Sequence, residues 1–100
     1  MPLDGLDLNA CYQRARKAYA ETVANNRQLF QEELEIDAND LVVNEDWVRV
    51  TFNGNDKNAF VLESNLRLVT STGRQVGYYR LCENEQCEVT DDYLVFDQPD

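Results

Sequence analysis

Residues 60–68, which read Phe-Val-Leu-Glu-Ser-Asn-Leu-Arg-Leu, decide the fold class of this 100-residue chain. Most even-numbered positions carry large apolar side chains, and most odd-numbered positions carry polar ones. A period of two is typical of a β-strand with one buried face and one exposed face. We therefore expect a strand over about 59–70, with Leu66 and Leu68 buried and Arg67 between them exposed.

The flanking segments extend this pattern into a sheet. Alternation over about 41–53 predicts a strand with Val48, Val50 and Phe52 inward and a bulge near 44–46. Two further strands are predicted over about 75–82 and 87–96. Turn-forming residues occupy 53–58, 71–74 and 83–86. Because all of these connections are of hairpin length, an antiparallel meander is the simplest topology.

The region before the sheet has helical periodicity. Apolar side chains recur every three or four residues over about 8–34, and Asp7 or Asn9 can cap the start. Asn25 and Asn26 are weak helix formers, so a bend or an early stop there stays open. The expected fold is α+β, a single domain over 1–100, with one long N-terminal amphipathic helix packed on a four-stranded antiparallel meander sheet. We expect a loose tail over 97–100.

The hairpin turns predict which side chains share the outer face of the sheet. A turn centred on Thr72-Gly73 pairs Leu66 with Tyr79 on the inner face. The residues expected together on the outer face are Trp47, Asn65, Arg67, Tyr78 and Arg80. Trp, Tyr and Arg are over-represented in binding hot spots. These residues are interpreted as a partner-binding patch, as a face that a second copy covers, or as ordinary cross-strand surface pairs.

The last hairpin allows two registers. One sets Cys82 opposite Cys87 and permits a disulfide, but it places apolar side chains of one strand opposite polar side chains of the other. The other shifts the pairing so that Val89 lies beside Leu81 on the inner face. We expect the second register.

The net charge of −10, from 19 acidic and 9 basic residues, disfavours negatively charged partners. Direct binding to nucleic acid or to an anionic membrane requires clustered Lys and Arg, so neither is expected. Residues 83–100 contain seven acidic residues and no Lys or Arg. An alternative binding surface is therefore the acidic set Glu83, Glu85, Glu88, Asp91 and Asp92, which would cap a basic protein or mimic the charge of nucleic acid.

The chain offers little catalytic chemistry. It has no His, which removes the commonest general base and most zinc sites. Asp91 and Asp92 are adjacent, so on a strand their carboxylates point to opposite faces. We expect no metal, no cofactor and no enzymatic activity, with a small enzyme as the weakest alternative.

The cysteines and the N-terminal residues indicate the cellular compartment in which the protein is expected. Three cysteines are an odd number and argue against a secreted disulfide framework. The N-terminus is acidic without an apolar run, and no stretch approaches the length of a membrane span. We expect a cytoplasmic protein-interaction or assembly module that binds a protein partner or its own copy through the outer sheet face.

Overall fold

The computed structural model describes residues 6–52, 54 and 59–97, and it has the predicted α+β architecture. Helix α1 (Leu8–Asn25) is followed by the short helix α2 (Arg27–Leu34) and a 3-10 turn (Ala38–Asp40). The strands are β1 (Val42–Phe52), β2 (Phe60–Val69), β3 (Gln75–Glu83) and β4 (Val89–Phe96). Their order in the sheet is β1-β2-β3-β4, and every pair is antiparallel. The predicted turn at 53–58, apart from Gly54, and the tail from 98 onward lie outside the described residues.

The region predicted to be helical, 8–34, forms one long helix and one short helix, and the break falls at Asn26, where an early stop had been left open. The side chain of Asp7 caps α1 by accepting from the backbone N–H of Asn9 at 3.0 Å. The helix ends where Asn26 leaves helical geometry, with φ −136°. The side-chain amide of Asn26 donates to the carbonyl oxygen of Thr22 at 2.8 Å. This side chain satisfies a carbonyl of the last turn, so the backbone can turn there and start α2 in a new direction.

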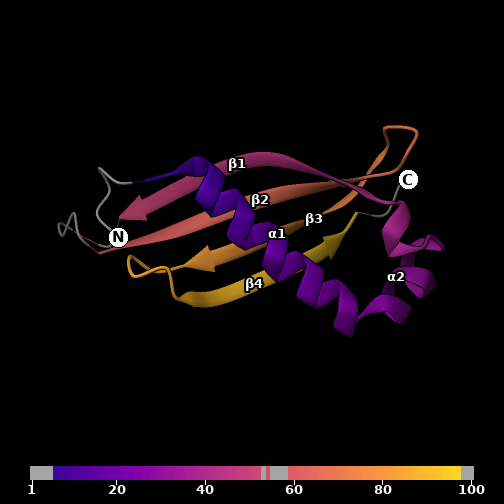
Figure 1. Ribbon diagram of the computed structural model, residues 1–100, viewed down its shortest axis with the longest axis horizontal. Helices are drawn as coiled ribbons and strands as arrows, with labels where there is room; N and C mark the ends of the chain where they lie inside the picture. The colour runs from indigo at the N-terminus through magenta and orange to yellow at the C-terminus, as the bar shows by residue number, and fades with distance from the viewer. Residues whose placement is uncertain (1–5, 53, 55–58, 98–100) are drawn as a thin grey trace.

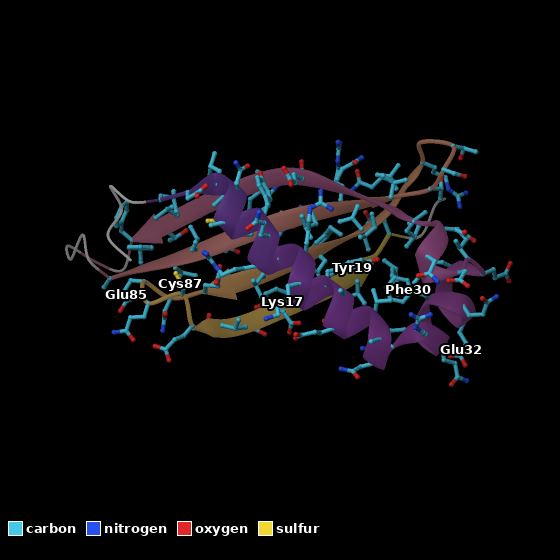
Figure 2. The ribbon with its side chains drawn as sticks, viewed as in Figure 1. Lys17, Tyr19, Phe30, Glu32, Glu85 and Cys87 are labelled. Carbon is cyan, nitrogen blue, oxygen red and sulfur yellow. The ribbon has the colours of Figure 1, made fainter. Side chains whose placement is uncertain are left out.

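Helix α1 crosses one face of the sheet, and α2 lies beside one end of the sheet (Figure 1). The buried stripe of α1 includes Tyr19, whose ring packs edge-on against Tyr79 of β3 with centroids 5.7 Å apart. Phe30 of α2 packs in the same way against Phe96 of β4, at 5.1 Å. Figure 2 shows Tyr19 and Phe30 on the sheet side of their helices, whereas Glu32 points away from the sheet. The break at Asn26 therefore lets α2 aim Phe30 at the end of the sheet.

The registers predicted for the first three strands are confirmed. Leu66 pairs with Tyr79, Leu68 with Gly77, and Phe52 with Phe60. Leu66 and Leu68 are fully buried and Arg67 is exposed. The bulge predicted near 44–46 lies between Glu45 and Trp47. Strand periodicity and turn position were sufficient to predict these registers, because both are local properties of the chain.

The register expected for the last strand is wrong. Leu81 pairs with Asp92 rather than with Val89, which lies opposite Glu83. The connecting turn is built by Asn84, whose side-chain oxygen accepts from the backbone N–H groups of Gln86 and Glu88 at 2.9 and 3.0 Å. This turn occupies residues that were assigned to the start of the strand, so β4 begins at Val89.

The disulfide alternative is not realised, and its geometry explains why. Cys82 pairs with Asp91 on the outer face, whereas Cys87 lies in the turn with φ +62°. Both are free thiols, as is the buried Cys11. Gly77 also constrains β4, because a Cβ there would collide with the carbonyl oxygen of Val95. The close approach of β3 and β4 at that point depends on a residue with no side chain.

Candidate functional site

The sheet face opposite the helices, here called the outer face, carries three cross-strand rows of side chains. Sheet pairing places Trp47, Asn65, Arg80 and Tyr93 in the first row. The second row is Asn44, Arg67, Tyr78 and Val95, and the third is Arg49, Glu63, Cys82 and Asp91. All five outer-face residues singled out from the sequence thus lie in two neighbouring rows.

Two arginines stack on Trp47. The guanidinium carbon of Arg80 lies 4.8 Å from the centre of the Trp47 ring, and that of Arg49 lies 5.1 Å from it. The guanidinium carbon of Arg80 also lies 4.9 Å from the centre of the Tyr78 ring, so one guanidinium contacts two aromatic rings. Such cation–π contacts contribute about 0.5–1 kcal/mol each at exposed sites. We call Trp47, Arg49, Tyr78 and Arg80 the Trp47 cluster.

A polar chain under the cluster holds Arg80 in place. Asn65 is only 3% exposed although it lies on the outer face. Its amide nitrogen donates to Asp46 at 3.0 Å, and its amide oxygen accepts from Nε of Arg80 at 3.2 Å. Asp46, Asn65 and Arg80 come from three adjacent strands, so the arginine is oriented before any partner arrives.

Asp46 was not foreseen as part of this site. It occupies the β1 bulge between Glu45 and Trp47, where regular alternation does not say which way a side chain points. The available signal was a bulge predicted next to Trp47, a residue assigned to the outer face. The bulge gives Asp46 access to the amide of Asn65, and it keeps Trp47 in register with the same residue.

The charges of the outer face are only partly balanced. Arg49 pairs with Glu63, with Nη2 and Oε1 2.7 Å apart. Within the described part of the chain, no carboxylate pairs with the exposed Arg67. The outer face therefore presents the unneutralised guanidinium of Arg67 in the same row as Tyr78, in a protein whose net charge is −10.

Tyr93 extends the first row at the β4 side and was missed by sequence reasoning. It is 46% exposed, and its hydroxyl donates to Asp91 at 2.8 Å. That hydrogen bond to an anion raises the pKa of the Tyr93 hydroxyl. The register that pairs Val89 with Leu81 would have placed Tyr93 on the inner face, and this is why it was overlooked.

The acidic residues of the alternative surface do not gather on one face. Glu83 is fully buried beneath α1, where both of its oxygens face Arg14. Asp92 lies on the helix side and accepts from the Tyr79 hydroxyl at 2.9 Å. Asp91 is on the outer face, and Glu85 and Glu88 belong to the turn between β3 and β4. As predicted from alternation, Asp91 and Asp92 point to opposite faces.

A groove runs on the helix side between α1 and β4. It consists of two adjoining pockets of about 250 and 370 Å³, both lined by Ala18, Glu21, Leu81 and Val89. Arg14, Lys17 and Cys87 line the first pocket, and Figure 2 shows Lys17 on the side of α1 towards β4. Across residues 6–52, 54 and 59–97, no three His, Cys, Asp or Glu side chains come together as metal ligands.

The comparisons with known proteins provide no relative. No family model, curated protein or solved structure matches this chain. Among the described elements, neither helix has the length and apolar character needed to cross a membrane.

Proposed function

We propose that this protein is a non-enzymatic interaction module that binds a protein partner through the outer face of its sheet. The position of the Arg80 side chain is the observation that supports this proposal. A single guanidinium is held over both Trp47 and Tyr78 and is fixed by Asn65, on a face that neither helix covers. Rigid aromatic and arginine anchors of this kind dominate the energy of protein interfaces, because little conformational entropy is lost when they bind.

The chemistry of the outer face favours a partner surface that combines carboxylates with apolar groups. Arg67 supplies a positive charge that no carboxylate of the described residues neutralises, while Trp47, Tyr78 and Tyr93 supply aromatic area. A second copy packed face to face would bring the arginines of both outer faces together. A different protein is therefore the favoured occupant, and self-association is an outcome that the experiment distinguishes.

We place this function in the cytoplasm. Cys11, Cys82 and Cys87 are free thiols, which fits a reducing compartment. The alternative of an acidic nucleic-acid mimic receives less support, because Glu83 is buried and Asp92 faces the helix side.

Affinity capture from the source cell, with wild type and matched variants as baits, tests the proposal. Trp47→Ala and Arg80→Ala should lose a partner that the wild type retains. Phe52→Ala is the control, since it removes an exposed aromatic ring from the same strand but from the helix side of the sheet. A partner retained by Trp47→Ala and Arg80→Ala would refute the assignment of this face, and a wild-type dimer that these variants abolish would identify a second copy as the occupant.

A further inference from the structure

Strand β4 leaves one edge of the sheet open. Among the strands that the structure describes, β1 and β4 lie at the two edges of the sheet, and β4 pairs with β3 alone. An unpaired edge presents backbone N–H and C=O groups that a further strand can bind. We propose that the β4 edge binds an extended basic segment of another protein as a fifth strand. This surface is separate from the outer face, so the proposal goes beyond the proposed function.

Hydrogen bonding shows which backbone groups of β4 are available. The N–H of Asp97 donates to the carbonyl of Val76 on β3 at 2.8 Å. Because backbone groups alternate in direction along a strand, those of Asp92, Leu94 and Phe96 point to the open edge. The N–H groups of Leu94 and Phe96 are the donors offered to a further strand, since the N–H of Asp92 is bonded to a side chain. In agreement, the N–H of Asp92 donates to the side chain of Asp91 at 2.9 Å rather than to β3. An incoming strand thus finds donors and acceptors at alternate residues.

The two edges of the sheet differ in their protection. Strand β1 is bulged between Glu45 and Trp47, near its middle, and it carries Arg49, and both features discourage pairing. The bulge of β4 lies at its N-terminal end, opposite Cys82 and Glu83, so residues 91–96 pair with β3 without interruption. Strand β4 has no Lys, Arg or Pro between Val89 and Phe96. Its side chains are poorly covered, with Val89 61% exposed. The carboxylates of Asp91 and Asp92 are the only charges on β4, and they repel acidic partners while attracting basic ones.

Helix α1 also provides a cover for the added strand. Figure 1 shows α1 running diagonally across the sheet, with its C-terminal end passing beyond β4. The groove between α1 and β4 opens along this side, above Val89 and Leu81 and beside Glu21. Side chains of a fifth strand that point towards the helix side would enter this groove and cover Val89.

The acidic side chains near the open edge favour a basic segment as the added strand. Asp91 and Asp92 lie on β4, Glu88 directly precedes this strand, and Glu21 lines the groove beside it. Lys17 is the basic side chain that lines the groove away from the Arg14–Glu83 pair. Pairing of β4 with β4 of a second copy would bring the aspartates of both chains close together, and like charges across a strand pair are destabilising. A segment in which Lys or Arg alternates with small or apolar residues would form backbone hydrogen bonds with β4 and would neutralise the nearby carboxylates.

The test uses a fluorescent eight-residue peptide, Lys-Val-Lys-Thr-Lys-Val-Lys-Thr, titrated with the full chain at about 0.05 M salt. Fluorescence anisotropy should show saturable one-to-one binding. N-methylation of alternate residues keeps the charge but removes the donors of one edge, and methylating the edge that faces β4 should weaken binding at least about tenfold. Amide shifts in NMR spectra should be largest for residues of β4.

Charge variants with a matched control complete the test. Combining Glu88→Gln with Asp91→Asn should weaken peptide binding about five- to tenfold. Combining Glu32→Gln with Glu33→Gln changes the net charge equally on α2 and should have no effect, and Trp47→Ala should also leave binding intact. Absence of saturable binding, or equal binding of both N-methylated forms, would overturn the proposal. A free protein that dimerises through β4 in analytical ultracentrifugation would overturn the choice of occupant.

Discussion

Arg14 and Glu83 form an ion pair beneath helix α1, across 69 residues of sequence. Nε of Arg14 lies 2.7 Å from Oε2 of Glu83, and Nη2 lies 3.4 Å from Oε1. The Glu83 side chain is 1% exposed and that of Arg14 is 31% exposed. The pair closes the end of the core where α1 crosses β3, and it gives Arg14 a strong anionic partner that raises its pKa further.

Removing one member of this pair should be more harmful than removing both. Arg14→Ala leaves a buried carboxylate without a partner and should lower the free energy of unfolding by about 3 kcal/mol. Arg14→Met combined with Glu83→Leu should recover most of that loss, because neither a charge nor a void remains. Urea denaturation measures both. Equal destabilisation by the single and double variants would contradict the argument.

Two buried tyrosines should respond in opposite ways to loss of the hydroxyl. The Tyr19 hydroxyl is buried and has no hydrogen-bond partner among the residues that the structure describes, so Tyr19→Phe should be neutral or should stabilise by about 1 kcal/mol. The Tyr79 hydroxyl donates to Asp92, so Tyr79→Phe should cost about 1 kcal/mol. Thermal or urea unfolding of the two variants at neutral pH compares them directly.

The same tyrosines predict a loss of stability in alkali. Burial raises the pKa of Tyr19 to about 12, from 10.0 for the ordinary side chain, and also raises that of Tyr79. The unfolded chain therefore ionises first. Their contribution should be fully present below about pH 10 and should be lost as pH rises from 10 to 12. Tyr19→Phe should flatten this decline in denaturation curves recorded at several pH values.

Neighbouring positions on β2 should differ sharply in their effect on stability. Leu66→Ala and Leu68→Ala each open a cavity in the core and should cost about 2–5 kcal/mol. Arg67→Ala, between them, should cost well under 1 kcal/mol, because the side chain is exposed. Chemical denaturation of the three variants checks this. An Arg67 variant that is the least stable of the three would be inconsistent with the register.

The single Trp makes the outer-face cluster observable without a partner. Arg80 stacks on Trp47, and Asn65 positions Arg80, so Arg80→Ala and Asn65→Ala should both change the Trp47 emission spectrum. Arg67→Ala removes an arginine from the neighbouring row and should leave the emission unchanged. A spectrum that is the same in all variants would show that Arg80 does not stay on the ring in solution.

Binding of the outer-face partner should depend on shape more than on long-range charge. Raising salt from about 0.05 to 0.5 M shortens the Debye length from roughly 14 to 4 Å, and this should weaken binding only modestly. Trp47→Ala should cost about 2 kcal/mol or more, chiefly through faster dissociation. Surface plasmon resonance at both salt concentrations separates the two effects. Binding that survives Trp47→Ala but disappears in high salt would point to the acidic hairpin instead.

The sequence by itself determined the layers, the first three strands and the outer-face residues that these three strands contribute in regular alternation. Alternation at Leu66, Arg67 and Leu68 depends on neighbouring residues only, and the turn at Gly73, with φ +93°, set the pairing of β2 with β3. The sequence therefore places Trp47, Asn65 and Arg80 in one row, because strand period and turn position suffice to align them.

The tertiary structure decided the remaining features, because they depend on contacts between distant residues or on side chains that rebuild the backbone. Asn84 bonds to its own turn and moves the start of β4, which put Tyr93 outside and Asp92 inside. Glu83 looks like a surface acid in the sequence, yet Arg14, 69 residues earlier, allows it to be buried. Local periodicity contains no information about such partners, since the two side chains meet only after α1 has packed on the sheet.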